Sequence, residues 1–318
     1  MLNLKSKKES RSSKVAIIGA GFVGSTAAYA LLNDGAASEI ALIDVNKEKA
    51  QGEAMDLQHG LLFKPNVKIE FGKDYGFCKD AEIVVITAGL HQKPGETRID
   101  LVNKNSAIFK EMIPQITKNN KDCIFLVVSN PLDVLTYLTL KYSGFPKNKV
   151  IGSGTILDTA RFRYLLGKYF EVSPNSVHAY ILGEHGDSSF PVWSAANIAG
   201  VNLKNFKRYN KKSMDEIYAE TKNAAYEVIA KKGATYYAIG LGITKIIKSI
   251  LSNQNDVLAL SSYLTNYNGI SDVCLSVPTI VNRQGIKEHI VLPLNSPEKK
   301  QLKKSAGVIK NVIKHCKV

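Results

Sequence analysis

The segment most informative about the architecture is Val15-Ala-Ile-Ile-Gly-Ala-Gly-Phe-Val-Gly24. An apolar run leads directly into a G-x-G-x-x-G motif, and the residues after the motif have helical character. Such glycines permit a tight turn and let the backbone approach a pyrophosphate at a helix N-terminus. The motif alone is weak evidence. With a strand before it and a helix after it, it predicts a dinucleotide-binding unit.

The next apolar run, Ile40–Asp44, ends in an acid twenty residues after Gly24. An acid at this point can accept hydrogen bonds from ribose hydroxyls, and its charge repels a 2′-phosphate, so NAD is favoured over NADP. The alternative is an ordinary turn with Asp44 as a helix cap. We expect cofactor contacts from the motif residues and the acid: Gly19, Gly21, Phe22, Val23, Gly24 and Asp44.

Val- and Ile-rich runs alternate with helical stretches through the first half of the chain. Fully apolar runs are typical of parallel strands buried on both faces. We predict strands over Val15–Ala20, Ile40–Asp44, Ile83–Ala88 and Ile124–Ser129, and helices over Gly24–Asn33 and Leu101–Asn119. Pro114 should kink or restart the second helix. This alternation predicts an α/β fold with a doubly wound parallel sheet, the Rossmann arrangement.

The pattern changes after about residue 150. We predict helices over Ile156–Phe170 and Lys212–Lys232, and strands over Val177–Leu182, Val273–Val281 and His289–Leu292, the last two separated by the turn signal at 282–285. The mixture predicts an NAD-binding Rossmann domain over 14–152 and an α+β catalytic, substrate-binding domain over 153–318. Residues 1–13 are expected to form a disordered basic tail.

Composition excludes several classes of protein. The 318 residues are 45% hydrophobic and 22% charged, which is typical of a globular protein. The four cysteines have no metal-ligand or disulfide spacing, which favours a reducing compartment, and we expect a cytoplasmic location. Apolar runs are too short to cross a membrane. The net charge of +14 leaves nucleic-acid binding as an alternative function. However, the C-terminal lysines lie on the helical segment Glu298–Lys314 without interleaved aromatic residues, so a solvated helix face is favoured.

Four further segments carry candidate catalytic residues. His185 lies between two glycines at a strand end, where its pKa suits proton transfer. Asp158 and Arg161 are three residues apart and share one helix face. The polar loop Gly89–Arg98 follows one predicted strand and Asn130 ends another, where ligands bind in open α/β sheets. Taken singly, each has a structural alternative: a surface histidine, an intrahelical ion pair, a surface turn or a turn cap.

The segments GAGFVG, MDLQHG, HQKPGETR, VSNPLD, LDTARFR and LGEHGD occur in order. Together they resemble the bacterial NAD-dependent L-lactate dehydrogenase family, within the lactate/malate dehydrogenase superfamily, over residues 14–316. The resemblance implies a cytoplasmic homotetramer that reversibly reduces pyruvate to L-lactate with NADH in fermentation. It also implies roles for individual residues: His185 as proton donor and acceptor, Asp158 as its orienting partner, Arg161 on the substrate carboxylate, Arg98 on the ketone, Asn130 near nicotinamide and substrate, and Thr235 and Ile239 in the substrate and nicotinamide pockets.

Gln92 discriminates between lactate and malate dehydrogenases. Malate dehydrogenases resemble this loop but place an arginine there for the second carboxylate of oxaloacetate. A neutral glutamine would leave that charge unpaired, so pyruvate is favoured and malate dehydrogenase is the alternative. Ser276 departs from the glycine that is frequent in bacterial relatives.

The resemblance also implies regulation. Arg163 follows Arg161 by two residues, a rotation of about 200° around a helix, so it points away from the substrate. Relatives activated by fructose 1,6-bisphosphate resemble this chain at Arg163 and His178, which predicts an allosteric site for that sugar at a subunit interface. An NAD-dependent glycosidase would share the nucleotide fold but needs a metal. No ligand cluster for one is visible near His185, so no metal is expected.

Overall fold

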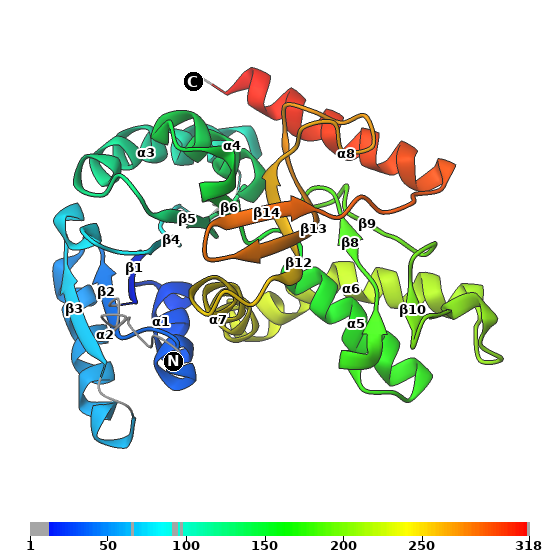
Figure 1. Cartoon of the computed structure of the whole chain (residues 1–318), viewed down its shortest axis with the longest axis horizontal. Helices are drawn as coiled ribbons and strands as arrows, with labels where there is room; N and C mark the ends of the chain where they lie inside the picture. The colour runs from blue at the N-terminus through cyan, green and yellow to red at the C-terminus, as the bar shows by residue number, and fades with distance from the viewer. Residues whose placement is uncertain (1–12, 65–66, 91–94, 96–97, 317–318) are drawn as a thin grey trace, which may run out of the picture.

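The computed structural model describes residues 13–64, 67–90, 95 and 98–316, with Arg98 described by its backbone alone. Within these residues one nine-stranded sheet has the order β14-β13-β12-β6-β5-β4-β1-β2-β3 (Figure 1). Ser13 bonds to Ser38 through its amide, while residues 1–12 of the expected tail lie outside the described residues.

The first half of the chain forms the parallel part of this sheet. Its strands are β1 (Lys14–Ile18), β2 (Glu39–Ile43), β3 (Lys68–Gly72), β4 (Ile83–Ile86), β5 (Ile124–Val127) and β6 (Val150–Gly152). Their order, 3-2-1-4-5-6, is that of dinucleotide-binding sheets. The four strands predicted here are confirmed. Strand β3 was not predicted, because it alternates charged and apolar residues at the sheet edge and lacks the continuous apolar run of a buried strand.

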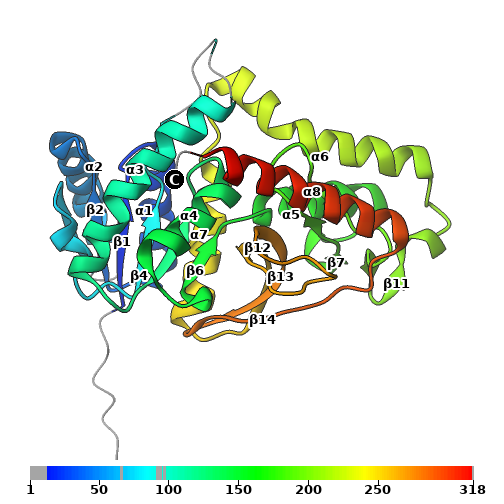
Figure 2. The ribbon, with the colours of Figure 1, turned by 90° about the horizontal axis from the view of Figure 1, so that it is seen from above.

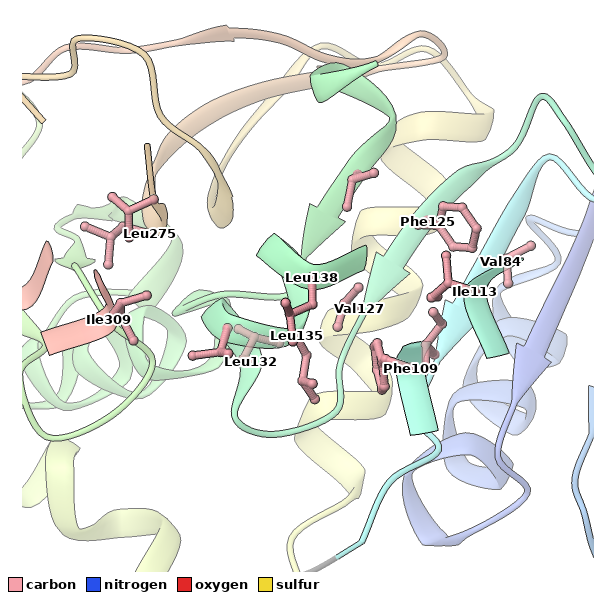
Figure 3. Packing of buried hydrophobic residues seen from close by; sticks show 14 of the residues in the cluster. Val84, Phe109, Ile113, Phe125, Val127, Leu132, Leu135, Leu138, Leu275 and Ile309 are labelled. Atoms are coloured by element: carbon pink, nitrogen blue, oxygen red, sulfur yellow. The ribbon is translucent and has the colours of Figure 1, made fainter. Parts of the chain in front are cut away.

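Alternate residues of the parallel strands point to opposite faces, and both faces are covered. Val15 and Ile17 pack with α1 (Phe22–Asp34) and α7 (Tyr237–Leu251) on one face. Ala16 and Ile18 belong to the cluster on the other face, which includes apolar residues of α3 (Arg98–Asn119), α4 (Leu132–Ser143) and α8 (Ser296–His315) (Figure 3). Burial on both faces explains why these strands are continuously apolar.

Two helices of the first half add to the predictions. Of the two effects expected at Pro114, a restart does not occur: α3 is continuous through this residue, and its apolar face, including Phe109, Ile113 and Ile116, is buried on the sheet. Helix α2 (Lys47–His59) was not predicted. Its N-cap is Asn46, whose side chain accepts a hydrogen bond from the amide of Lys49. Asp44 therefore does not cap this helix.

In the second half, α5 (Ile156–Phe170) and α6 (Lys211–Lys232) occupy the predicted segments. The antiparallel strands β12 (Asp256–Tyr263), β13 (Cys274–Asn282) and β14 (Gly285–His289) join the parallel part through a pairing of Ser261 with Gly152. The sheet is therefore continuous from one half of the chain to the other.

Two predicted strands are placed differently. The run Val177–Leu182 divides into β7 (Val177–His178), which pairs with β10 (Asn197–Ile198), and β8 (Ile181–Leu182), which pairs with β9 (Phe190–Pro191). β10 also pairs with β11 (Val201–Asn202). The segment expected at 289–292 starts earlier, because the turn after β13 pairs Asn282 directly with Gly285 and so β14 begins at once.

Helix α8 confirms the helical spacing seen near the C-terminus. Leu302, Ala306 and Ile309 are buried, and the helix packs against α4 (Figure 2) and against β9. Glu298 is buried as well, because it completes a capping box with Asn295 and accepts hydrogen bonds from the amide and hydroxyl of Ser194. This anchoring holds α8 against the second half of the chain.

Candidate active site

The turn between β1 and α1 holds the predicted glycines. Gly19 has a φ of +101°, and a Cβ at Gly24 would lie 1.8 Å from the carbonyl oxygen of Gly19, so this packing requires glycine at position 24. Gly21 is the N-cap of α1, and a Cβ there would meet no atom within 4 Å. The open space beside Gly21 lies at a helix N-terminus, where backbone amides attract phosphate oxygens.

Two side chains of this turn lie on the face of the sheet that α7 covers. Phe22 is 69% exposed and stacks on Tyr236, with ring centroids 5.2 Å apart. Val23 and Ile239 are both partly buried and pack against the same apolar cluster. The structure therefore brings the predicted cofactor residues of α1 and α7 to one face of the sheet.

Asp44 lies beside the turn at the end of β2. One carboxylate oxygen accepts a hydrogen bond from the amide of Ala20 at 2.7 Å, and the other accepts from the amide of Asn46 at 2.9 Å. Each oxygen can accept a further bond. Asp44 is thus held against the glycine turn with capacity for ribose hydroxyls, and the glycine cradle and this acid fit an adenine dinucleotide.

A buried asparagine side chain joins the segments that follow β4 and β5. Asn105 of α3 is fully buried, donates to the carbonyl oxygens of Leu90 and Asn130, and accepts from the amide of Leu90. It ties the segment after β4 to the segment after β5, at the carboxyl edge of the sheet. Asn130 itself is exposed there.

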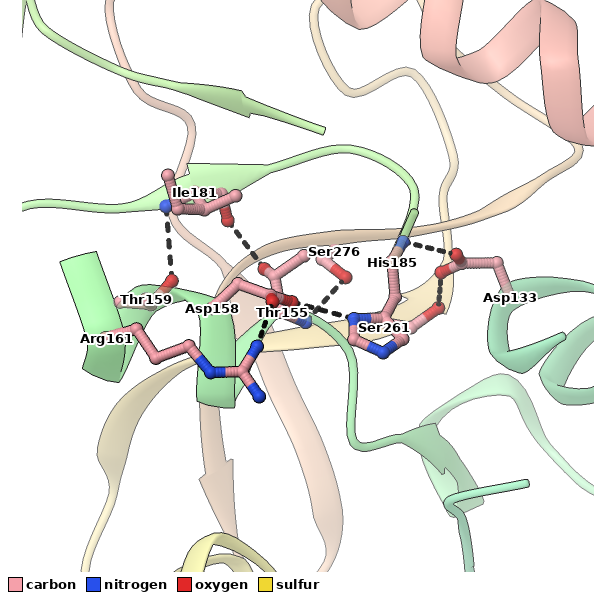
Figure 4. A network of polar contacts seen from close by, with 9 residues as sticks. All are labelled: Asp133, Thr155, Asp158, Thr159, Arg161, Ile181, His185, Ser261 and Ser276. Atoms are coloured by element: carbon pink, nitrogen blue, oxygen red, sulfur yellow. Dashed lines mark hydrogen bonds and ion pairs between the residues drawn. The ribbon is translucent and has the colours of Figure 1, made fainter. Parts of the chain in front are cut away.

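His185, Asp158 and Arg161 meet in the second half of the chain (Figure 4). The Nδ1 atom of His185 lies 2.7 Å from Oδ2 of Asp158, and Nη1 of Arg161 donates to Oδ1 of Asp158 at 3.0 Å. Because an ionised carboxylate only accepts hydrogen bonds, Nδ1 carries the proton and Nε2 remains for a ligand. The three side chains are 30%, 17% and 17% exposed, so a ligand can reach the histidine.

The charges of this cluster are matched. Burial disfavours the imidazolium, but the charge and hydrogen bond of Asp158 outweigh burial and raise the pKa of His185. Burial acts to raise the pKa of Asp158, but His185 and Arg161 prevail and lower it. The arrangement favours an ionised carboxylate beside a histidine that keeps its proton above the usual pH range, which suits a general acid.

Asp133 was not among the predicted site residues, although it lies in the VSNPLD segment. Asp133 is buried and accepts hydrogen bonds from the amide of His185 at 2.7 Å and from the hydroxyl of Ser261 at 2.6 Å. Burial raises its pKa to about 6. The sequence signal that could have identified Asp133 is its charge within the otherwise apolar first turn of α4.

Buried hydroxyls support the same region. Thr155 donates through its hydroxyl to the carbonyl of Ile181 at 2.6 Å, and its amide donates to the hydroxyl of Ser276 at 3.0 Å. The hydroxyl of Thr159 accepts from the amide of Ile181. These bonds attach the start of α5 to β8 and β13, so the serine that departs from the family pattern supports the helix that carries Asp158.

Other predicted residues are not joined to this cluster by the described contacts. Thr235 is partly buried between α6 and α7. Arg163 donates to the carbonyl of Asn175 on the outer side of α5, and His178 is exposed in β7. Gln92 lies outside the described residues, and Arg98 begins α3 without a described side chain.

The residues that the structure describes lack two kinds of feature. These residues contain no group of three His, Cys, Asp or Glu side chains that could hold a metal ion. Among the same residues, no helix is both long and apolar enough to span a bilayer.

A large open cavity, about 1570 Å³, lies at the amino ends of the parallel strands, opposite the carboxyl edge that holds the site. Some of its charged groups pair with one another, as in Lys14 with Glu39 and Arg283 with Glu82.

Comparisons with known proteins agree with this geometry. Residues 13–152 match the family description "lactate/malate dehydrogenase, NAD binding domain", and residues 155–318 match "lactate/malate dehydrogenase, alpha/beta C-terminal domain". An L-lactate dehydrogenase of Acetivibrio thermocellus is 54% identical over 306 residues, covering 95% of this chain and 96% of that protein. L-lactate dehydrogenase 1 of Peribacillus psychrosaccharolyticus is 51% identical over 310 residues, covering 96% and 98%. The crystal structure of the minor L-lactate dehydrogenase from Enterococcus mundtii, in a ligands-bound form, has a TM-score of 0.93 at 44% identity and covers 96% of this chain and 98% of that one.

Proposed function

The chain belongs to the lactate/malate dehydrogenase family, and from this premise we propose that it is an NAD-dependent L-lactate dehydrogenase. The reaction is the reversible reduction of pyruvate to L-lactate. The observation that supports the proposal is the contact of Asp158 with both His185 and Arg161, because a histidine and an arginine on one carboxylate suit a proton donor and a partner for a substrate carboxylate. Relatives about half identical to this chain carry the same name.

We assign the chemistry to these side chains as follows. Bound NADH supplies the hydride. The guanidinium of Arg161 holds the pyruvate carboxylate through paired hydrogen bonds, since its contact with Asp158 uses one of five donors. Nε2 of His185 donates a proton to the developing alkoxide, and Asp158 stabilises the imidazolium before transfer. Arg98 is proposed to polarise the ketone, and Asn130 and Thr235 to contact the substrate.

The proposed cofactor contacts follow the nucleotide turn. Gly19, Gly21 and Gly24 allow the backbone to approach the pyrophosphate, and Asp44 accepts from the ribose hydroxyls. Phe22, Val23, Asn130 and Ile239 complete the proposed set. We retain 14–152 as the NAD-binding domain and 153–318 as the catalytic domain.

Pyruvate is the proposed substrate because position 92 is glutamine. The test compares kcat/KM for pyruvate and oxaloacetate under identical NADH, followed by the absorbance of NADH. We expect pyruvate to be preferred, and Gln92→Arg to move the ratio toward oxaloacetate by about tenfold or more, because it supplies a partner for the second carboxylate. Faster turnover of oxaloacetate by the wild-type enzyme would instead favour malate dehydrogenase.

A matched control separates the position of the charge from its presence. Gln301→Arg adds the same charge to the exposed face of α8 and should leave the substrate ratio unchanged. If both variants moved the ratio alike, Gln92 would not contact the substrate.

We also propose that the enzyme is a cytoplasmic homotetramer that regenerates NAD in fermentation and is activated by fructose 1,6-bisphosphate. The regulatory site would contain Arg163 and His178. Supporting this, Arg163 donates to Asn175, three residues before His178 along the chain, and lies away from the Asp158 contact. Large apolar side chains exposed on α2, α6 and α7 support assembly with further subunits: Met55, Tyr226, Ile229, Tyr237 and Leu241.

A further inference from the structure

The segment Gly183–Ser189, here called the His185 loop, is held from several sides by buried polar groups. We propose that Asp133 is a positioning residue for the reaction: with Ser305 it fixes the His185 loop, and its negative charge stabilises the protonated form of His185. The inference rests on the proposed function, which makes His185 the proton donor.

Three consecutive amides of the loop are bound by three separate elements. The amide of Gly183 donates to the carbonyl of Ser276 in β13 at 3.0 Å, that of Glu184 donates to the hydroxyl of Ser305 in α8 at 2.7 Å, and that of His185 donates to Asp133 in α4 at 2.7 Å. Ser276 and Ser305 are fully buried and Asp133 nearly so. Because buried amides are costly to leave unpaired, these bonds specify one backbone path for the loop.

The path is also sterically tight. Gly183 has a φ of +94°, and a Cβ there would lie 2.6 Å from the hydroxyl oxygen of Ser305. Glu184 is buried, and its carboxylate accepts a hydrogen bond from the hydroxyl of Ser188. The loop can therefore shift little without breaking polar contacts. The hydrogen bond from the backbone amide of His185 to Asp133 consequently fixes the position of the His185 backbone, and with it the position of the imidazole ring.

Asp133 also acts through its charge. Its second bond comes from the neutral hydroxyl of Ser261 (Figure 4), so this contact leaves its charge uncompensated. Asp133 is one of the groups that raise the pKa of His185, after Asp158. The other titratable and charged groups that interact with Asp133 or His185 come from α5, β13 and the loop: Asp158, Arg161, Cys274 and Glu184. Tyr218 of α6 lies one step farther away and interacts with Asp158 and Asp187.

The sign of the effect follows. An ionised Asp133 favours the imidazolium, so replacing it by a neutral residue should make His185 lose its proton at lower pH. A role limited to satisfying the amide would leave that titration unchanged. The two roles can therefore be separated by substitutions that remove either the charge or an anchor.

The experiment measures the titration of His185 directly, by NMR of protein labelled with ¹³C-histidine, with the resonance assigned from His185→Asn. The chain has only 6 histidines, which keeps the spectrum simple. Asp133→Asn keeps the size and an acceptor for the amide but loses the charge. We expect the His185 titration to move down by roughly one pH unit, and the high-pH limit of kcat/KM for pyruvate to move with it.

Ser305→Ala is the complementary variant. It releases the amide of Glu184 while both carboxylates remain, so kcat should fall severalfold with the pH profile in place. An unchanged His185 titration in folded Asp133→Asn would overturn the charge role, and an unchanged kcat in Ser305→Ala would overturn the anchoring role.

A second variant covers the case in which Asp133→Asn does not fold. Ser261→Ala removes the hydroxyl that stabilises the ionised form of Asp133, so the pKa of Asp133 rises and less negative charge faces His185. The His185 titration should therefore still move to lower pH, by less than in Asp133→Asn. No movement there would also overturn the charge role. Failure of the proposed function is seen separately, as absent pyruvate turnover by the wild-type enzyme, because the NMR titration needs no substrate.

Discussion

His185 keeps its proton in a partly enclosed site because carboxylates from two helices compensate for its burial. One contacts the ring directly and the other contacts the backbone amide of the same residue. Reduction of pyruvate uses the protonated ring, and oxidation of lactate uses the neutral ring. The position of this titration therefore sets the pH range of each direction.

The first prediction at this scale concerns pH. Because the pKa of His185 is raised, kcat/KM for pyruvate should be flat below that raised value and fall about tenfold per pH unit above it. Asp158→Asn removes the main stabilising charge, so the fall should begin at lower pH. Lactate oxidation should gain activity over the same range in which reduction loses it. Steady-state rates in both directions across pH provide the measurement.

His185→Asn is the reference for this prediction. It should lower hydride transfer by orders of magnitude while NADH still binds, as read from the fluorescence of the bound nucleotide. Loss of NADH binding with intact chemistry would contradict the assignment of His185.

At the scale of elements, the N-terminus of α1 contains two glycines that are needed for different reasons, Gly24 for packing and Gly21 for the proposed cofactor. Gly24→Ala would place a methyl group 1.8 Å from the carbonyl of Gly19, so α1 must move, and we expect a loss of about 3 kcal/mol or more in unfolding free energy. Gly21→Ala meets no protein atom, so the free energy of unfolding should stay nearly constant. Its methyl group would occupy the space proposed for the pyrophosphate, and the Kd for NADH should rise tenfold or more.

Denaturant unfolding and NADH titration of the two variants check this prediction. Equal loss of stability in both would show that the space beside Gly21 is needed for folding. Unchanged NADH affinity in Gly21→Ala would place the pyrophosphate elsewhere.

At the scale of the whole molecule, the proposed regulation depends on subunit assembly. We expect a tetramer by light scattering, and fructose 1,6-bisphosphate should lower the apparent KM for pyruvate by favouring the active assembly. Arg163→Gln should remove most of this response without abolishing basal turnover. Arg208→Gln, which removes an exposed charge that pairs with Glu171, is the control and should respond as wild type does.

Two results would count against this regulatory proposal. A monomer under working conditions would exclude a site shared between subunits. An undiminished response in Arg163→Gln would locate the activator at other residues.

Most of the architecture can be predicted from the amino acids alone, because the signals for strands and turns are local. Strands buried on both faces have continuous apolar sequences. The turn after β1 has glycine at positions 19 and 24 because neither position has room for a side chain. Edge strand β3 was missed, since its alternating residues lack that signal. The division of 177–182 between two small sheets depends on partners elsewhere in the chain.

The site divides in the same way. The motifs predicted that His185, Asp158 and Arg161 belong to the site. Only the packing of α5 against β8 brings Nδ1 of His185 to 2.7 Å from the carboxylate of Asp158, which lies 27 residues earlier. Asp133 is 52 residues from His185, and Ser305 is 121 residues from Glu184. These contacts arise from tertiary packing, because three elements distant in the chain converge on one loop and no local pattern shows which amide each element will bind.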